Sequence, residues 1–341
     1  MISVAKDSTG DFTSIQAAVD SIKSTPEIIY IKNGIYNERV EIRLDNITLK
    51  GESAKDTIIT NNYYARMIMD DGIKRGTFRS YTFFVNANHF RASDITFENS
   101  SGFGLDVGQA VAVYAEGDDI HFKNCRMLGH QDTLFTGPLP LKEKEPGGFT
   151  GPTEFAKRIP GRQLYEDCYI CGEIDFIFGS ATAYFKNCEL YALNRNEKIN
   201  SYYTAPSTYS NQKYGYVFDH CRLTGNCPDR TVMLSRPWRI YAKAVFLNCE
   251  MRLQRPVLVI GTKKNPMIHA IMQNIIVMVK DMFHKKDRHM SISLLKLKLK
   301  NIQWKKFLTL RFIRLNHKKT PSKSVTSLRV FLYTFYIFTG Y

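Results

Sequence analysis

A short phrase recurs along the first 250 residues of the chain: an aromatic residue, two mostly polar residues and a small residue. The intervals between successive copies are 25, 43, 20, 33 and 28 residues. Recurrence at about 20–50 residues is typical of a solenoid, in which each turn buries its apolar face only against its neighbours. Five copies end in cysteine and one in serine: Phe122–Cys125, Tyr165–Cys168, Phe185–Cys188, Phe218–Cys221, Phe246–Cys249 and Phe97–Ser100.

Short runs of β-branched or aromatic residues surround these phrases, such as Val111–Tyr114 and Val245–Leu247, and Gly, Asn and Asp interrupt them. Short strands separated by loops of variable length predict an all-β chain folded as a right-handed parallel β-helix. The longest loop is expected at Pro138–Gly161. A helix at about Ser14–Ile22 has one apolar stripe and is expected to cap the N-terminal end of the stack.

The positive charge of the chain is confined to its last quarter. The whole chain has a net charge of +15, but residues 251–341 alone hold 19 Lys and Arg against two acids. Residues 1–250 hold 28 basic and 30 acidic residues. A nucleic-acid-binding domain carries its positive charge on the folded surface that docks, so this distribution argues against nucleic acid as a partner. We expect a β-helix domain at residues 1–256 and a basic tail at residues 257–341.

The ends of the chain and its cysteines bear on its compartment. The segment Met1–Asp7 lacks the basic and apolar regions of a signal peptide, which predicts a cytoplasmic chain as written. The most apolar stretch, Val330–Thr339, is much shorter than the ~20 residues that span a bilayer. Seven cysteines, an odd number, favour free buried thiols over a disulfide framework. A zinc site at Cys168, Cys171, Cys221 and Cys227 is the alternative, but two of these four already end a repeat phrase.

Two aspartates lie at equal distances from their repeat cysteines. Asp132 follows Cys125 by seven residues, and Asp175 follows Cys168 by seven. Equal offsets predict that both carboxylates lie on one face of the solenoid, on neighbouring coils. Capping of turns is the alternative role, since most loop aspartates do that. The apolar run around Asp175 argues against it, because a charge there is costly unless it is paired.

Two glutamines are expected on the same face. Gln131 adjoins Asp132, and Gln109 lies nine residues after Ser100, on the preceding coil. The repeat therefore predicts a cluster of two carboxylates and two amides, made from residues that are far apart in the sequence.

Five segments are similar, in family order, to the signature blocks of pectin methylesterases. Ser235 stands where that family usually has glycine. The resemblance covers about residues 1–250 and implies a parallel β-helix pectinesterase, which hydrolyses methyl esters of polygalacturonate to pectate and methanol. The segments are Gly34–Glu38, Gln109–Ala112, Gly129–Phe135, Asp175–Gly179 and Leu234–Trp238.

The resemblance also implies roles for individual residues. Asp175 is similar to the nucleophile, and Asp132 to the general acid that protonates methanol and then activates water. Arg236 resembles the residue that pairs with the nucleophile, although a surface ion pair is its alternative role. Gln109 and Gln131 resemble the oxyanion hole, in which one lost donor costs ~10²–10³ in rate.

Substrate contacts are implied for Trp238 as a platform under a sugar ring, for Thr77, and for Phe178, Arg236 and Gln109. A core position is the alternative for Trp238. The implied partner is methyl-esterified homogalacturonan (pectin), bound by a monomer with no metal or organic cofactor. Members of the family are mostly exported, in contrast to the compartment expected above.

Other functions remain open at this point. A polygalacturonase or pectate lyase also acts on this polymer, but neither needs two glutamines beside the aspartates. A carbohydrate-binding solenoid needs a groove and Trp238 but not Asp175. A hydrolase of small esters or thioesters is a further alternative. No Gly-x-Ser-x-Gly motif supports a serine esterase.

The resemblance ends near Pro256. The remaining residues hold only two glycines and no further repeat phrase, and they predict an irregular or partly helical tail. A basic extension that binds an acidic partner is one interpretation. We favour a shift of reading frame near codons 256–259, because the neighbouring frame of Ile271–Val279 permits residues similar to the family's next signature. Loss of the last coils would then impair activity.

Overall fold

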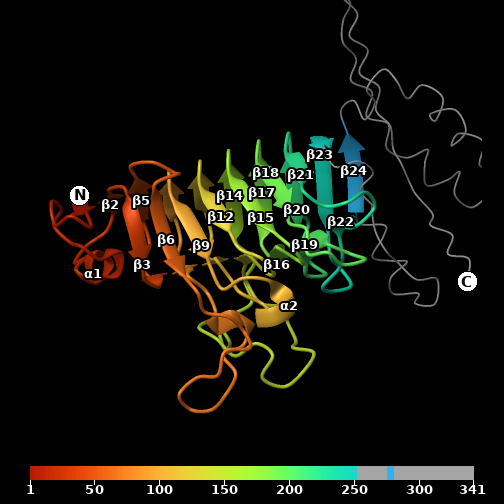
Figure 1. Cartoon of the computed structure of the whole chain (residues 1–341), viewed down its shortest axis with the longest axis horizontal. Helices are drawn as coiled ribbons and strands as arrows, with labels where there is room; N and C mark the ends of the chain where they lie inside the picture. Colours follow the sequence, from red (N-terminus) through yellow and green to blue (C-terminus); the bar gives the residue numbers. More distant parts are fainter. Residues whose placement is uncertain (252–274, 280–341) are drawn as a thin grey trace, which may run out of the picture. The chain divides into compact units, whose positions relative to one another are not determined.

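The computed structural model describes residues 1–251 and 275–279, and this part of the chain winds in coils of three short strands each. Every pairing between its named strands is parallel and joins neighbouring coils. Figure 1 shows the strands of successive coils side by side along the solenoid, with helix α1 (Ile15–Asp20) near the N-terminus. The predicted parallel β-helix is confirmed.

The strands form three faces, and each complete coil contributes one strand to each face. The first face consists of β1 (Ile2–Val4), β2 (Glu27–Ile31), β5 (Ile47–Gly51), β8 (Arg91–Ser93), β11 (Ile120–Lys123), β14 (Arg162–Glu166), β17 (Thr182–Lys186), β20 (Tyr216–Asp219), β23 (Ala244–Met251) and β24 (Ile275–Val279). The second consists of β3 (Gly34–Asn37), β6 (Thr57–Asn61), β9 (Thr96–Asn99), β12 (Arg126–Leu128), β15 (Tyr169–Gly172), β18 (Glu189–Ala192), β21 (Arg222–Gly225) and the end of β23. The third consists of β4 (Val40–Ile42), β7 (Phe83–Asn86), β10 (Val113–Glu116), β13 (Leu134–Thr136), β16 (Ile177–Gly179), β19 (Ser201–Pro206) and β22 (Val232–Ser235).

The repeat phrase marks the turn from the first face to the second. Its aromatic residues stack through the interior, with Tyr165 and Phe185 rings 4.6 Å apart and nearly parallel. Its third residue takes a left-handed conformation, as at Asn187 (φ 55°), which Asn and Asp tolerate better than most residues. Its cysteine is buried and donates to the carbonyl of the preceding coil, as Cys188 does to Tyr165 at 3.3 Å. Cys168 and Cys221, two members of the alternative zinc set, occupy such positions.

One predicted copy of the phrase is wrong. Phe97–Ser100 is not at the turn: Phe97 lies within β9, opposite Met127. The turn of that coil is made by Asp94, which has a φ of 60°, and Ile95 takes the position of the cysteine. Asn99 has a different role from the third residue of the other copies, because its buried side-chain amide donates hydrogen bonds to three backbone carbonyls.

Helix α1 begins one residue after Ser14, within the expected range, and ends at Asp20. The Ser14 hydroxyl accepts from the Ala17 amide, as N-cap residues do. Glu38, from the first signature block, accepts hydrogen bonds from the amides of Ile15 and Gln16, each at 3.0 Å. A carboxylate at this end also complements the helix dipole. Glu38 thus holds the cap of the solenoid.

The outer face of the third sheet carries an apolar cluster. Phe84, Tyr114, Phe135 and Phe178 point out from successive strands and are buried. They are covered by η1 (Thr77–Arg79) and by the long loop between β13 and β14, residues 137–161, which matches the predicted loop. In Figure 1 the segments before β7 and before β14 project on the same side as α2 (Gly104–Val107).

The prediction of an irregular or partly helical tail is wrong for residues 275–279. They form β24, which pairs in parallel with β23, so that Ala244 lies opposite Ile275. The open edge of β23 offers unpaired backbone groups to a further strand, which explains this addition. The rest of the predicted tail, and the interpretation as a shifted frame, lie outside the described residues.

Candidate active site

Asp132 and Asp175 occupy the same position on neighbouring coils. Each lies two residues before a strand of the third face, and those strands pair with Leu134 opposite Ile177. The Asp132 amide donates to the Ile174 carbonyl at 3.1 Å. Adjacent strands are roughly 4.8 Å apart, so the two side chains start as direct neighbours. Both residues have a positive φ, 65° and 54°, which turns their carboxyl groups out of the regular strand pattern. The predicted register of the two aspartates is confirmed.

Arg236 binds Asp175 through two parallel hydrogen bonds. Its Nε and Nη2 atoms lie 2.6 Å and 2.5 Å from the two carboxylate oxygens. Arg236 directly follows β22, which is two strands from β16, so its side chain reaches back over the intervening coil. On that coil lies Tyr202, whose ring centre is 4.6 Å from the guanidinium carbon. The arginine is therefore fixed both by charge and by an aromatic ring.

The two carboxyl groups have different electrostatic surroundings. Burial raises the pKa of Asp132 well above its ordinary value, and the nearby charge of Asp175 raises it further, against a smaller opposing effect of Arg236. Burial also raises the pKa of Asp175, but there the hydrogen bonds and charge of Arg236 act in the other direction. The shared site therefore favours a protonated Asp132 beside an ionised Asp175.

Gln131 lies on the same coil as Asp132. Gln109 lies on the preceding coil, before β10. The Ala110 amide donates to the Gln131 carbonyl at 3.0 Å, which places the two segments side by side. Both glutamines are partly exposed. Neither side-chain amide has a hydrogen-bond partner within residues 1–251 and 275–279, so both remain available to an incoming oxygen. Ser100 is not at the turn of its coil, so the offset used to predict the position of Gln109 started from the wrong residue. The predicted coil of Gln109 was right.

A buried hydrogen-bonded pair, which was not predicted from the sequence, lies beside Gln131. Glu173 is fully buried, and its Oε1 lies 2.8 Å from His130 Nδ1. Its Oε2 accepts from the Gly104 amide at 3.2 Å. Gly104 is needed there, because an added Cβ would lie 2.7 Å from both Cβ and Oε1 of Gln131. The only sequence signal was an acid two residues before Asp175 in an apolar run.

Trp238 lies at the edge of the apolar cluster and is partly exposed. Its ring stacks on Phe78 at 6.4 Å and meets the edge of Phe178 at 5.7 Å. Phe178 is only 3% exposed, so it supports the tryptophan from below and offers little surface to a ligand. Thr77 precedes Phe78 in η1 and is therefore brought to the same region as Trp238.

Two further residues near Asp175 were not singled out in the sequence. Tyr202 occupies the Asp175 position on the next coil, since Ile177 pairs with Thr204, and a register argument extended by one coil would have found it. Lys144, in the long loop, lowers the pKa of Asp175 through its charge. A loop residue of this kind has no periodic signal.

Within the part of the chain that the structure describes, no group of three or more His, Cys, Asp or Glu residues could hold a metal ion. No helix among the described residues has the length and apolarity needed to cross a membrane.

Comparison with known proteins decides the family. The family model described as Pectinesterase matches residues 1–138 and 157–256. The chain belongs to the pectinesterase family. This family of carboxylic ester hydrolases is the one expected from the five signature blocks.

Individual pectinesterases agree with this assignment. Pectinesterase 31 of Arabidopsis thaliana is 35% identical over 255 residues, which cover 72% of this chain and 71% of that protein. Pectinesterase A of Dickeya dadantii is 34% identical and matches 69% of this chain and 65% of that protein. The chain spans 44% of some longer relatives, such as the probable pectinesterase/pectinesterase inhibitor 44 of Arabidopsis thaliana.

Solved structures of pectin methylesterases share the fold. The enzyme from Erwinia chrysanthemi superposes with a TM-score of 0.64 at 33% identity, over 73% of this chain and 78% of that one. The enzyme from carrot gives a TM-score of 0.65 at 27% identity, over 81% and 80% of the two chains. One pectin methylesterase structure holds a hexasaccharide and is 34% identical to this chain.

Proposed function

We propose that this chain is an aspartyl pectinesterase, which hydrolyses methyl esters along polygalacturonate to free carboxylates and methanol. The observation that carries the proposal is the pairing of Arg236 with both oxygens of Asp175, directly beside the buried Asp132. This arrangement supplies an ionised carboxylate and a carboxylic acid at one position, as two-step acyl transfer requires.

In the first step an oxygen of Asp175 attacks the ester carbonyl carbon. The carbonyl oxygen takes negative charge, which the side-chain amides of Gln109 and Gln131 are positioned to receive as hydrogen-bond donors. When the bond to the methoxy oxygen breaks, Asp132 gives its proton to that oxygen and methanol leaves. The uronate acyl group is then joined to Asp175 as a mixed anhydride.

In the second step the ionised Asp132 takes a proton from water, and the resulting hydroxide attacks the acyl carbonyl. The anhydride bond breaks, which releases the uronic acid and restores ionised Asp175 and protonated Asp132; the acid then loses its proton to solvent and becomes uronate. Arg236 stabilises Asp175 as nucleophile and as leaving group. Trp238, on its support of Phe78 and Phe178, offers an aromatic face to a sugar ring next to the reacting ester.

The test is methanol release from methyl-esterified pectin by the full chain. Asp175→Asn and Asp132→Asn are expected to lower kcat by at least ~10³-fold, because each removes a group that reacts. Asp229→Asn is the matched control, since Asp229 is exposed. New reducing ends or unsaturated ends without methanol would instead identify a polygalacturonase or a lyase. Binding of pectin with no methanol release would identify a carbohydrate-binding solenoid.

A further inference from the structure

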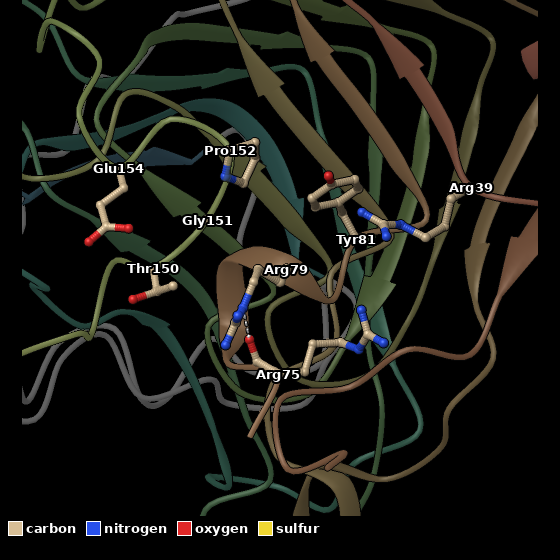
Figure 2. A pocket seen from close by; sticks show the side chains of 8 residues that line it. All are labelled: Arg39, Arg75, Arg79, Tyr81, Thr150, Gly151, Pro152 and Glu154. Atoms are coloured by element: carbon tan, nitrogen blue, oxygen red, sulfur yellow. Dashed lines mark hydrogen bonds between the residues drawn. The ribbon is translucent and has the colours of Figure 1, made fainter. Parts of the chain in front are cut away.

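Three arginines line a pocket of about 320 Å³ between η1 and the long loop. Arg39 comes from the turn before β4, Arg75 lies just before η1, and Arg79 is the last residue of η1 (Figure 2). Residues 150–154 of the long loop form the opposite wall, and they belong to the segment that the family model leaves unmatched. The pocket is therefore built partly from residues outside the shared family pattern.

The positive charge of the pocket is only partly neutralised. Arg39 lies 3.4 Å from Glu41, but that carboxylate also binds Arg43 at 2.9 Å and accepts from the Tyr81 hydroxyl. Within residues 1–251 and 275–279, neither Arg75 nor Arg79 has a carboxylate at ion-pair distance. The Nε atoms of Arg39 and Arg75 are buried and have no hydrogen-bond partner among the described residues. Glu154, on the loop wall, is the single acid among the residues that line the pocket.

The arginines are held in place before any ligand arrives. The guanidinium carbon of Arg75 lies 3.8 Å from the ring centre of Tyr63, and that of Arg39 lies 4.3 Å from the ring centre of Tyr81. Arg79 donates to two backbone carbonyls and so fixes the approach to η1. Such stacking lowers the entropic cost of binding a ligand between planar cations.

The pocket lies on the same side of the solenoid as the candidate active site. Phe83 pairs with Val113, and Val113 with Leu134, so Tyr81 occupies the Asp132 position two coils earlier. At roughly 4.8 Å per coil, this separation along the solenoid is about 10 Å. Phe78, between Thr77 and Arg79 in η1, stacks on Trp238. A linear polymer that lies along the solenoid with one sugar unit at Trp238 can therefore place another, more distant unit at the arginines.

We propose that this arginine pocket binds a free carboxylate of polygalacturonate, at a unit distant from the ester under attack. The inference rests on the proposed function, which supplies the polymer. Guanidinium groups recognise carboxylates through paired hydrogen bonds and charge, and a methyl ester has lost both the charge and one acceptor. The pocket therefore selects chains that already carry a de-esterified unit near the reacting ester, and it places the next reaction beside earlier ones.

The test measures binding by calorimetry for two ligands, unesterified hexagalacturonate and its fully methyl-esterified form, with the full chain and each variant carrying Asp175→Asn, so that the esterified ligand is not hydrolysed during the titration. Arg75→Gln combined with Arg79→Gln is expected to weaken binding of the unesterified ligand about tenfold or more relative to the esterified one. Lys50→Gln combined with Lys55→Gln removes the same charge from an exposed site elsewhere and is the control. Arg75→Lys combined with Arg79→Lys keeps the charge and is expected to recover part of the loss.

Unchanged relative affinity in the double glutamine variant, with a melting temperature equal to that of the wild type, overturns the inference. So does an equal loss in the lysine control, because general electrostatic attraction would then explain the binding. The binding measurement needs no turnover, so the two proposals fail separately. Wild-type chain that releases no methanol but binds hexagalacturonate through these arginines disproves only the esterase function.

Discussion

The hydroxyl group of Thr153, in the long loop, donates a 2.8 Å hydrogen bond to the buried carboxyl group of Glu116 at the end of β10. Tyr114 shares the same hydroxyl at 2.5 Å. Gly137, at the start of the loop, packs against Glu116 so closely that a Cβ would lie 2.7 Å from its carboxyl oxygen. Glu116 thus holds the loop that carries Phe149 to the underside of Trp238.

This contact predicts that stability falls as the pH rises. Burial raises the pKa of Glu116 from 4.5 to about 7, so the folded state favours the protonated acid. The corresponding stability is present below the unfolded pKa and is lost as the pH rises through about 7. The full effect is roughly 3 kcal/mol. Glu116→Gln should keep its stability between about pH 5 and pH 8, where the wild type loses it.

The measurement is the difference in melting temperature between wild type and Glu116→Gln across this pH range. Glu197→Gln, at an exposed position, is the control and should follow the wild type. A pH-independent difference between wild type and Glu116→Gln would contradict the assignment.

Removal of Arg236 should change the pH dependence of methanol release as well as its rate. The guanidinium opposes the rise in pKa that burial causes at Asp175, so Arg236→Gln raises that pKa. The acid limb of the profile of kcat/KM against pH should then move to higher pH, and kcat should fall about tenfold or more. Arg222→Gln, which breaks the pair with Glu189 on another face, is the control. A lower rate with an unmoved acid limb would argue against this role.

Glu173 is expected to act as a positioning residue. Glu173→Ala leaves the His130 ring and the Gly104 amide without their partner, and it should lower the free energy of unfolding by about 2–4 kcal/mol. Glu173→Gln retains hydrogen-bonding atoms in the same shape and should recover a large part of both stability and kcat. If the alanine variant were as stable as the wild type by thermal unfolding, the buried pair would have no structural role.

A single methyl group at Gly104 tests the position of Gln131. Gly104→Ala places a Cβ 2.7 Å from the Cβ of Gln131, and that side chain must move. Since an oxyanion donor acts only from the correct position, kcat should fall about tenfold while KM changes little. Leu105→Ala, at an exposed neighbour in α2, serves as the control. Equal kinetics for the two variants would show that Gln131 is not a donor to the oxyanion.

The sequence was sufficient to predict the coils and the central residues of the site. Cys125 and Cys168 mark the same turn, and each coil has the same path over the next seven residues, so Asp132 and Asp175 had to meet. Residues Phe97–Ser100 match the repeat phrase in composition, but Asp94 makes the turn of that coil, so this copy of the phrase was predicted wrongly. Local composition does not reveal which residue takes a left-handed conformation.

The amino-acid sequence alone determined the parallel β-helix and the adjacency of the two aspartates, because a stacked repeat converts equal offsets into contacts. The arginine beside them was implied by the resemblance to the family and not by the repeat. Only the tertiary structure decided the hydrogen bond of Glu173 with His130, the anchoring of the long loop at Glu116 and the pocket of Arg39, Arg75 and Arg79. These contacts join loops that leave the coils, and the path of a loop depends on packing against distant residues, which no periodic pattern specifies.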